Sequence, residues 1–91
     1  MMRKLAFKEN SWQQYEQIIV KNKKLLKKFH EMIKEMLRSN DLTQGIGKPE
    51  PLKYEIEQKY SRRLSEKDRL VYSFDDNYIY IHSIGGHYDD H

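Results

Sequence analysis

The spacing of apolar residues divides the chain into a helical part and a strand-rich part. Over residues 23–38 apolar side chains recur at helical intervals, with lysines and glutamates on the opposite face, and this pattern predicts an amphipathic helix. Trp12, Tyr15 and Ile19 follow a shorter helical pattern. The polar residues 21–24 lie between the two patterns and predict a tight break. Two successive helices are therefore expected in the first half of the chain.

The second half of the chain changes to the composition of β-strands. Three segments are rich in Tyr, Ile, Val and Phe and are separated by turn-forming residues: 60–64, 69–74 and 78–84. Short connections between consecutive strands imply an antiparallel meander. Residues 3–8 form one more candidate strand, before an expected helix N-cap at Asn10-Ser11. The order of elements predicts an α+β domain, with two N-terminal helices packed on a small antiparallel sheet.

The composition fits one folded domain with a basic surface. The 91 residues are 37% hydrophobic and 12% aromatic, which supports a single modest core. The net charge of +3 favours an acidic partner such as nucleic acid, although a basic domain without such a partner explains the charge equally well. The absence of cysteine excludes disulfides and thiolate metal sites. No apolar run is long enough for a signal peptide or a membrane span, so no membrane association and a cytoplasmic location are expected.

The residues with unusual backbone preferences gather beside one glutamate and one histidine. Two glycines and both prolines flank Glu50, and the other two glycines immediately precede His87. Proline restricts the backbone on both sides of Glu50, while glycine permits conformations that other residues avoid. Loops also attract glycine and proline, so an ordinary linker and an ordinary chain terminus account for the same pattern.

The predicted sheet adds a cationic group to this glutamate and histidine. Arg62, Arg63 and Arg69 lie on two strands predicted to be adjacent, so they can present a patch that suits phosphate. Metal-free RNA cleavage requires a base for the 2′-OH proton, a cation for the phosphorane and an acid for the leaving 5′-oxygen. Glu50 and His87 are not at the spacing of a metal motif, so neither a metal nor a cofactor is expected.

Three sequence blocks occur in the order and spacing of one known family. These blocks are GKPEPLK at 47–53, YSRRLSEKDRLVY at 60–72 and HY at 87–88. On them the chain resembles, from Leu5 to Tyr88, the YoeB/Txe toxins of bacterial type II toxin–antitoxin modules, a branch of the RelE/ParE superfamily. The resemblance implies a single RelE/ParE-like domain over residues 1–88. A short acidic tail at 89–91 and the glycines before His87 depart from the family pattern.

The resemblance also implies an activity and a set of site residues. It implies an mRNA interferase, a ribosome-dependent endoribonuclease that cuts mRNA in the A site by metal-independent acid–base catalysis and so inhibits translation. Glu50 would be the general base, Arg69 would stabilise the scissile phosphate, and His87 would be the general acid. Four further residues would hold the RNA backbone or position the nucleotide: Lys53, Arg62, Arg63 and Tyr88.

The same resemblance names the partners and leaves one alternative function. The partners would be an acidic antitoxin of the YefM/Axe type, the ribosome and its mRNA, operator DNA through the antitoxin alone, and a second copy of the chain in a homodimer. The alternative is a non-catalytic, ParE-like toxin that inhibits a protein target by binding. The combination of Glu50, Arg69 and His87 favours the enzyme, since a binding protein does not need it. His82, on a predicted strand, is expected to be structural.

Overall fold

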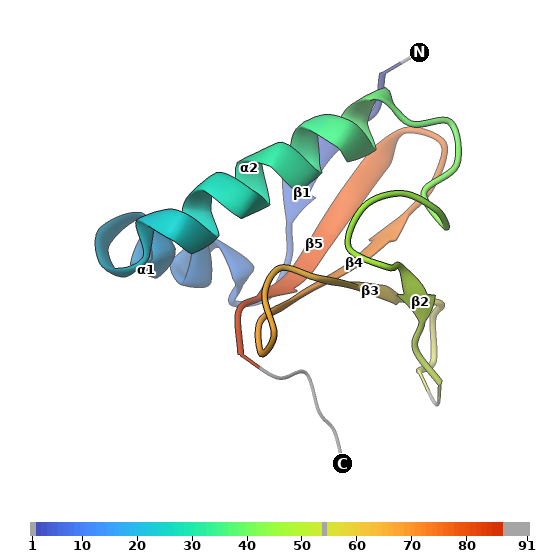
Figure 1. The fold of residues 1–91 in the computed structure, drawn as a ribbon. Helices are drawn as coiled ribbons and strands as arrows, with labels where there is room; N and C mark the ends of the chain where they lie inside the picture. The colour runs from blue at the N-terminus through green and yellow to red at the C-terminus, as the bar shows by residue number, and fades with distance from the viewer. Residues whose placement is uncertain (1, 54, 87–91) are drawn as a thin grey trace.

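Five strands form one sheet in the described part of the chain, and α2 lies across one of its faces (Figure 1). The computed structural model describes residues 2–53 and 55–86. Its elements follow in this order: β1 (Lys4–Phe7), α1 (Ser11–Lys21), α2 (Lys23–Arg38), β2 (Glu50–Pro51), β3 (Tyr60–Arg63), β4 (Arg69–Phe74) and β5 (Tyr78–Ile84). The predicted α+β class, with two helices ahead of the main strands, is therefore confirmed.

The order of strands across the sheet is β1-β5-β4-β3-β2. The meander of β3, β4 and β5 is antiparallel, as predicted, and β2 extends it by pairing with β3. At the other edge β1 pairs with β5 in the parallel direction, which the sequence pattern did not predict. The residues of β1 do not show which strand of the meander it pairs with. That pairing depends on the path of the two helices that connect β1 to the meander.

The two helices begin in different ways. Asn10 precedes α1, but its side chain makes no capping hydrogen bond, so that part of the N-cap prediction is wrong. The Ser11 hydroxyl instead donates to the carbonyl of Ile81 (2.8 Å), which fastens the start of α1 to β5. Asn22, in the predicted break, caps α2 by accepting a hydrogen bond from the Leu25 N–H (3.1 Å).

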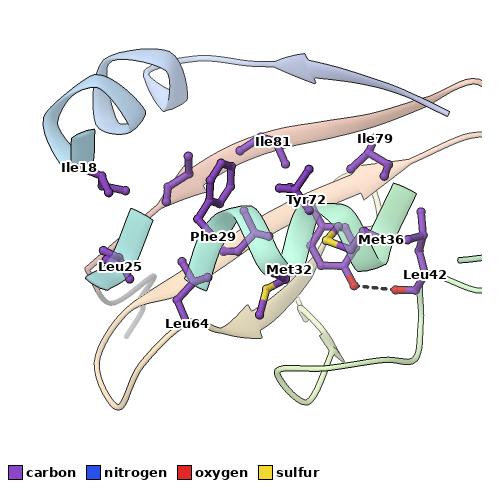
Figure 2. Packing of buried hydrophobic residues seen from close by; sticks show 13 residues of the cluster. Ile18, Leu25, Phe29, Met32, Met36, Leu42, Leu64, Tyr72, Ile79 and Ile81 are labelled. Atoms are coloured by element: carbon purple, nitrogen blue, oxygen red, sulfur yellow. Dashed lines mark hydrogen bonds between the residues drawn. The ribbon is translucent and has the colours of Figure 1, made fainter. Parts of the chain in front are cut away.

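The hydrophobic core lies between α2 and the sheet (Figure 2). One face of α2 supplies five buried residues: Leu25, Phe29, Met32, Ile33 and Met36. They belong to the same cluster as Leu70 and Tyr72 of β4 and Ile79 and Ile81 of β5. Side chains alternate between the two faces of a strand, so the intervening residues of β4 point to the opposite face of the sheet. Neither helix among the described residues combines the length and hydrophobicity that crossing a membrane requires.

Gly47 allows the loop between α2 and β2 to approach both α2 and β3 closely. A β-carbon at this position would lie 2.6 Å from the Met32 methyl carbon and 2.9 Å from the Arg63 carbonyl oxygen, and the backbone φ is +81°. The Gly47 carbonyl also accepts the Arg63 N–H (2.7 Å). This contact fixes the loop to β3 three residues before Glu50.

We expect Gly47→Ala to destabilise the protein more than Gly86→Ala. Both glycines have positive φ, and at Gly86 no atom of the described residues lies within 4 Å of an added β-carbon, so that variant carries the backbone cost alone, about 1–2 kcal/mol. Gly47→Ala adds overpacking against the backbone carbonyl of Arg63 as well as Met32, a further cost of about 1–3 kcal/mol. Urea unfolding followed by circular dichroism measures both. Equal losses in the two variants would contradict the close approach at Gly47.

Candidate active site

Glu50 lies in a row of residues on the sheet face that points away from α2. It pairs with Ser61 of β3, Ser61 pairs with Val71 of β4, and Val71 pairs with Ser83 of β5. Directly opposite residues of antiparallel strands share one face. The neighbours of Val71 along β4 face the core, so this row faces outward. The Glu50 side chain is exposed and makes no hydrogen bond with any described residue, which leaves its carboxylate available to a ligand.

Arg63 and Arg69 form the next row on the same face. They lie directly opposite each other on β3 and β4, two residues along from Ser61 and Val71. This register places Arg69 about 7 Å along the strands and about 10 Å across them from Glu50. A group as large as one nucleotide can therefore contact both side chains.

The β3–β4 turn holds the guanidinium of Arg69. Its Nη1 donates to the carbonyls of Ser65 (3.1 Å), Glu66 (3.2 Å) and Asp68 (3.1 Å). Within the part of the chain that the structure describes, Nε and Nη2 have no hydrogen-bond partner. The bonds of Nη1 thus fix the orientation of the guanidinium, while Nε and Nη2 keep donors for an anion. This arrangement is expected of an arginine that binds phosphate.

The end of β5 runs beside this turn. The Gly85 N–H donates to the Arg69 carbonyl (2.9 Å), and the Gly86 N–H donates to Asp68 Oδ1 (2.9 Å). His87 and Tyr88, the predicted general acid and nucleotide-positioning residue, follow at once but lie outside the described residues, so their roles stay predictions. Lys53 lies two residues after β2 and is exposed.

Arg62 does not belong to the exposed cationic patch, which corrects the prediction that it binds RNA. It alternates with Ser61 and Arg63 along β3, so it faces α2, and its side chain is 0% exposed. Its five N–H groups have five acceptors: Glu35 Oε1 (2.7 Å), Ile46 O (3.3 Å), Leu42 O (3.3 Å), Gln44 O (2.7 Å) and Tyr72 Oη (3.0 Å). No donor is left for a substrate. The sequence did carry a signal, because Tyr60 and Leu64, two residues away on either side, are apolar.

The Arg62 contacts organise the loop that leads to Glu50. Three of its acceptors are backbone carbonyls of residues 42–46, and one is a carboxylate of α2. Tyr72 adds a second contact by donating its hydroxyl to the Leu42 carbonyl at 2.6 Å, the dashed line in Figure 2. Burial raises the pKa of the Tyr72 phenol, so the hydroxyl keeps the proton that it donates. The position of Glu50 therefore depends on two buried side chains.

The chain matches one family over nearly its whole length. A family model described as a YoeB-like toxin of bacterial type II toxin-antitoxin system matches residues 7–88. Toxin YoeB of Synechocystis sp. is 44% identical over 85 residues, which cover 93% of this chain and 96% of that protein. The chain belongs to the YoeB family of toxins. The matched range contains every residue that the sequence predicted for the site.

Solved structures of the YoeB family have the same fold. The YoeB dimer from Staphylococcus aureus superposes with a TM-score of 0.87 at 39% identity, covering 97% of this chain and 100% of that chain. The YoeB–YefM complex from Staphylococcus aureus gives 0.83 at 40% identity, again covering 97% and 100%. A chain of the archaeal RelE–RelB complex from Pyrococcus horikoshii shares the fold alone, with a TM-score of 0.71 at 15% identity. The predicted RelE/ParE-like fold is confirmed.

A second polar cluster lies on the outward face of this YoeB-family sheet. His82 is buried, and its Nε2 lies 2.8 Å from the Ser73 hydroxyl. Its Nδ1 lies 3.6 Å from Glu9 Oε2 and has no hydrogen bond. Burial is the main cause that lowers the pKa of His82, and the charge of Lys59 acts in the same direction, while Glu9 opposes them. The imidazole is therefore neutral near pH 7.

The described residues contain no group of three or more His, Asp or Glu side chains arranged to hold a metal ion. The outward face instead offers a carboxylate, two arginines and a histidine–serine pair as separate groups. These are groups for binding an anion and transferring a proton.

Arg62→Met should destabilise the protein by about 3 kcal/mol, because it leaves the half-buried Glu35 carboxylate and several loop carbonyls without the donors of a fully buried guanidinium. The adjacent Arg63→Met, on the exposed face, is the matched control and should change stability by about 0.5 kcal/mol or less. Urea unfolding of both variants gives the comparison. Similar losses in the two would contradict the structural role of Arg62.

The free energy of unfolding should fall as the pH drops below the ordinary His value of 6.5, because the unfolded state then binds a proton that buried His82 resists. Above that pH the contribution of His82 is complete. His82→Gln should remove this part of the pH dependence, whereas His30→Gln, at an exposed histidine that contacts Tyr15, should retain it. Urea unfolding between about pH 5 and pH 8 measures the slopes. Identical slopes in the wild type and His82→Gln would rule out a titration of His82.

Proposed function

We propose that this YoeB-family toxin is a ribosome-dependent mRNA endoribonuclease that cuts mRNA in the ribosomal A site and thereby inhibits translation. The observation that carries the proposal is the placement of Glu50, Arg63 and Arg69 on the sheet face that points away from α2. The β5 strand ends beside Arg69, and His87 is the next residue in sequence after Gly86. A base, a phosphate-binding cation and an acid are the groups that cleavage by 2′-OH attack requires.

In the proposed reaction Glu50 removes the proton from a ribose 2′-OH, and the resulting oxygen attacks the adjacent phosphorus. Arg69 stabilises the extra negative charge of the phosphorane through the donors that the turn leaves free. The bond from phosphorus to the 5′-oxygen breaks, and His87 supplies the proton for that oxygen. The products are a 2′,3′-cyclic phosphate and a 5′-hydroxyl. Side chains alone perform these steps, so the mechanism calls for no metal or cofactor.

The remaining predicted residues bind and position the RNA in this proposal. Arg63 and Lys53 are exposed near Arg69 and Glu50, and their charges suit the phosphates of the flanking nucleotides. Tyr88 follows the proposed general acid and would position the nucleotide by stacking on its base. Arg62 contributes only indirectly, by holding the loop that precedes Glu50.

The proposed partners follow from the family and from the charge of the site. An acidic, YefM-like antitoxin would cover the basic face, which agrees with the existence of a YoeB–YefM complex from Staphylococcus aureus. A homodimer agrees with the YoeB dimer from the same organism. Operator DNA would be reached through the antitoxin, and the ribosome and mRNA would place the toxin's action in the cytoplasm.

Glu50→Gln should lower ribosome-dependent cleavage by about 10²- to 10⁴-fold, because glutamine keeps the shape of the side chain but cannot accept the proton. Primer extension on an mRNA in a reconstituted translation reaction maps the cuts. His87→Gln should have an effect of the same order, and Glu16→Gln, at an exposed glutamate of α1, should leave cutting unchanged.

Naked mRNA is run in parallel and should stay intact. Normal cutting by Glu50→Gln would remove Glu50 from the role of base. A wild type that cuts no mRNA on ribosomes would overturn the nuclease and favour the alternative, a ParE-like toxin that acts by binding a protein target.

A further inference from the structure

A pocket adjoins the Glu50 row on the outward face of the sheet. Its volume is about 480 Å³, and its lining includes six residues from four segments of the chain: Lys8, Glu57, Gln58, Ser73, Tyr80 and His82. Neither the fold nor the proposed cleavage chemistry assigns a task to these side chains. The volume is within the range of about 300–1,000 Å³ that is usual for small-ligand sites.

The register of the sheet places this pocket one step from the proposed cleavage site. Val71 belongs to the Glu50 row, and Ser73 follows on the same face of β4, about 7 Å further along the strand. Tyr80 lies directly opposite Ser73 on β5. RNA that places a ribose at Glu50 and a phosphate at Arg69 therefore has a neighbouring nucleotide within reach of the pocket.

A β-bulge in β5 places His82 in the pocket wall. Val71 pairs with Ser83 while Tyr72 pairs with Ile81, so His82 is the extra residue of β5. A bulge allows two consecutive side chains to point to one face. His82 is 5% exposed and bonded to Ser73 at 2.8 Å, so the wall is rigid and polar.

An aromatic ring forms another wall of the pocket. The Tyr80 hydroxyl donates to Asp75 Oδ2 (2.7 Å), and its ring stacks on that of Tyr78 with centroids 5.6 Å apart. The Lys8 ammonium lies 5.3 Å from the centroid of the same ring. These contacts fix the ring and place a cation over it. An aromatic side chain next to a cation is a combination that binds single-stranded RNA.

The edge of the pocket supplies hydrogen-bond acceptors. Gln58 uses its amide nitrogen to donate to the Lys59 carbonyl (2.8 Å), so its oxygen remains as an acceptor. Glu57 is exposed and adds a carboxylate. Such acceptors match an exocyclic amino group, which adenine, cytosine and guanine carry and uracil lacks.

We propose that this pocket binds the base of the nucleotide next to the cleaved bond and prefers a base that carries an exocyclic amino group. The inference rests on the proposed function, since it assigns the pocket to the same RNA. Tyr80 and His82 would form the wall that the base contacts, Glu57 and Gln58 would accept from its amino group, and Lys8 would neutralise its phosphate. The pocket would thus bias the choice of cleavage sites.

The first arm of the test compares cleavage maps of the wild type with those of Gln58→Ala and His82→Ala. The wild type should cut sites next to uracil less than other sites, and both variants should reduce this difference. His30→Ala should keep the wild-type map, because His30 also contacts a hydroxyl but lies on α2. Gln58 is exposed, so this variant tests the pocket even if His82→Ala fails to fold. Maps that are unchanged in Gln58→Ala and in a folded His82→Ala would overturn the proposal.

The second arm measures binding without cleavage, by NMR titration of the full chain with 2′-deoxy trinucleotides. The amide signals of Ser73, Tyr80 and His82 should shift, and Gln58→Ala should weaken binding of the cytosine trinucleotide by about tenfold but not that of the uracil one. Shifts confined to other residues, or equal binding of a free mononucleotide, would overturn the subsite. If the wild type cuts no mRNA, the proposed function is overturned. The titration still tests base binding in the pocket, because it measures binding without cleavage.

Discussion

The buried guanidinium of Arg62 is the interaction on which the candidate site depends. A charge removed from water is tolerated only when hydrogen bonds and an opposite charge replace the solvent. Here a carboxylate of α2, the hydroxyl of Tyr72 and three loop carbonyls replace it, so one side chain joins the helix, the sheet and the loop. The loop has no regular structure, and these bonds supply donors to carbonyls that the loop backbone itself does not pair. Glu50 follows directly from this ordered loop.

The two faces of the sheet carry different groups, one face the hydrophobic core and the other the residues of the candidate site. The face toward α2 carries the apolar cluster, and the opposite face carries Glu50, Arg63 and Arg69. A single layer of helix is enough to bury the apolar side of each strand, so the other face of the sheet can carry polar groups. The YoeB family match covers all the residues of this face that the structure describes in β2 to β5, and the proposed site lies on it. Its polar pocket extends this surface beyond the groups that the proposed cleavage uses.

Much of the site could be predicted from sequence, and the exception is instructive. Prolines on both sides of Glu50 and the placement of Arg63 and Arg69 on neighbouring strands are local features, so the expectation that they share a surface agrees with the register. Arg62 was assigned to the same surface because of its charge, although strand alternation directs it inward. A charged side chain is exposed in most cases, but Arg62 is buried because hydrogen-bond acceptors inside the protein take the place of water. His87 lies beyond the described residues, so its place in the site stays a prediction.

The sequence by itself determined the helices, the meander, the α+β class and the family, because hydrophobic period, turn residues and short motifs act between residues close along the chain. Only the tertiary structure decided that β1 pairs in parallel with β5, that Arg62 is buried, and that a bulge places His82 on the outward face. Each of these depends on partners far away in the sequence, such as Glu35, which lies 27 residues from Arg62. Periodicity shows which face of an element is apolar, whereas the partner of a buried polar group is settled only when the elements pack together.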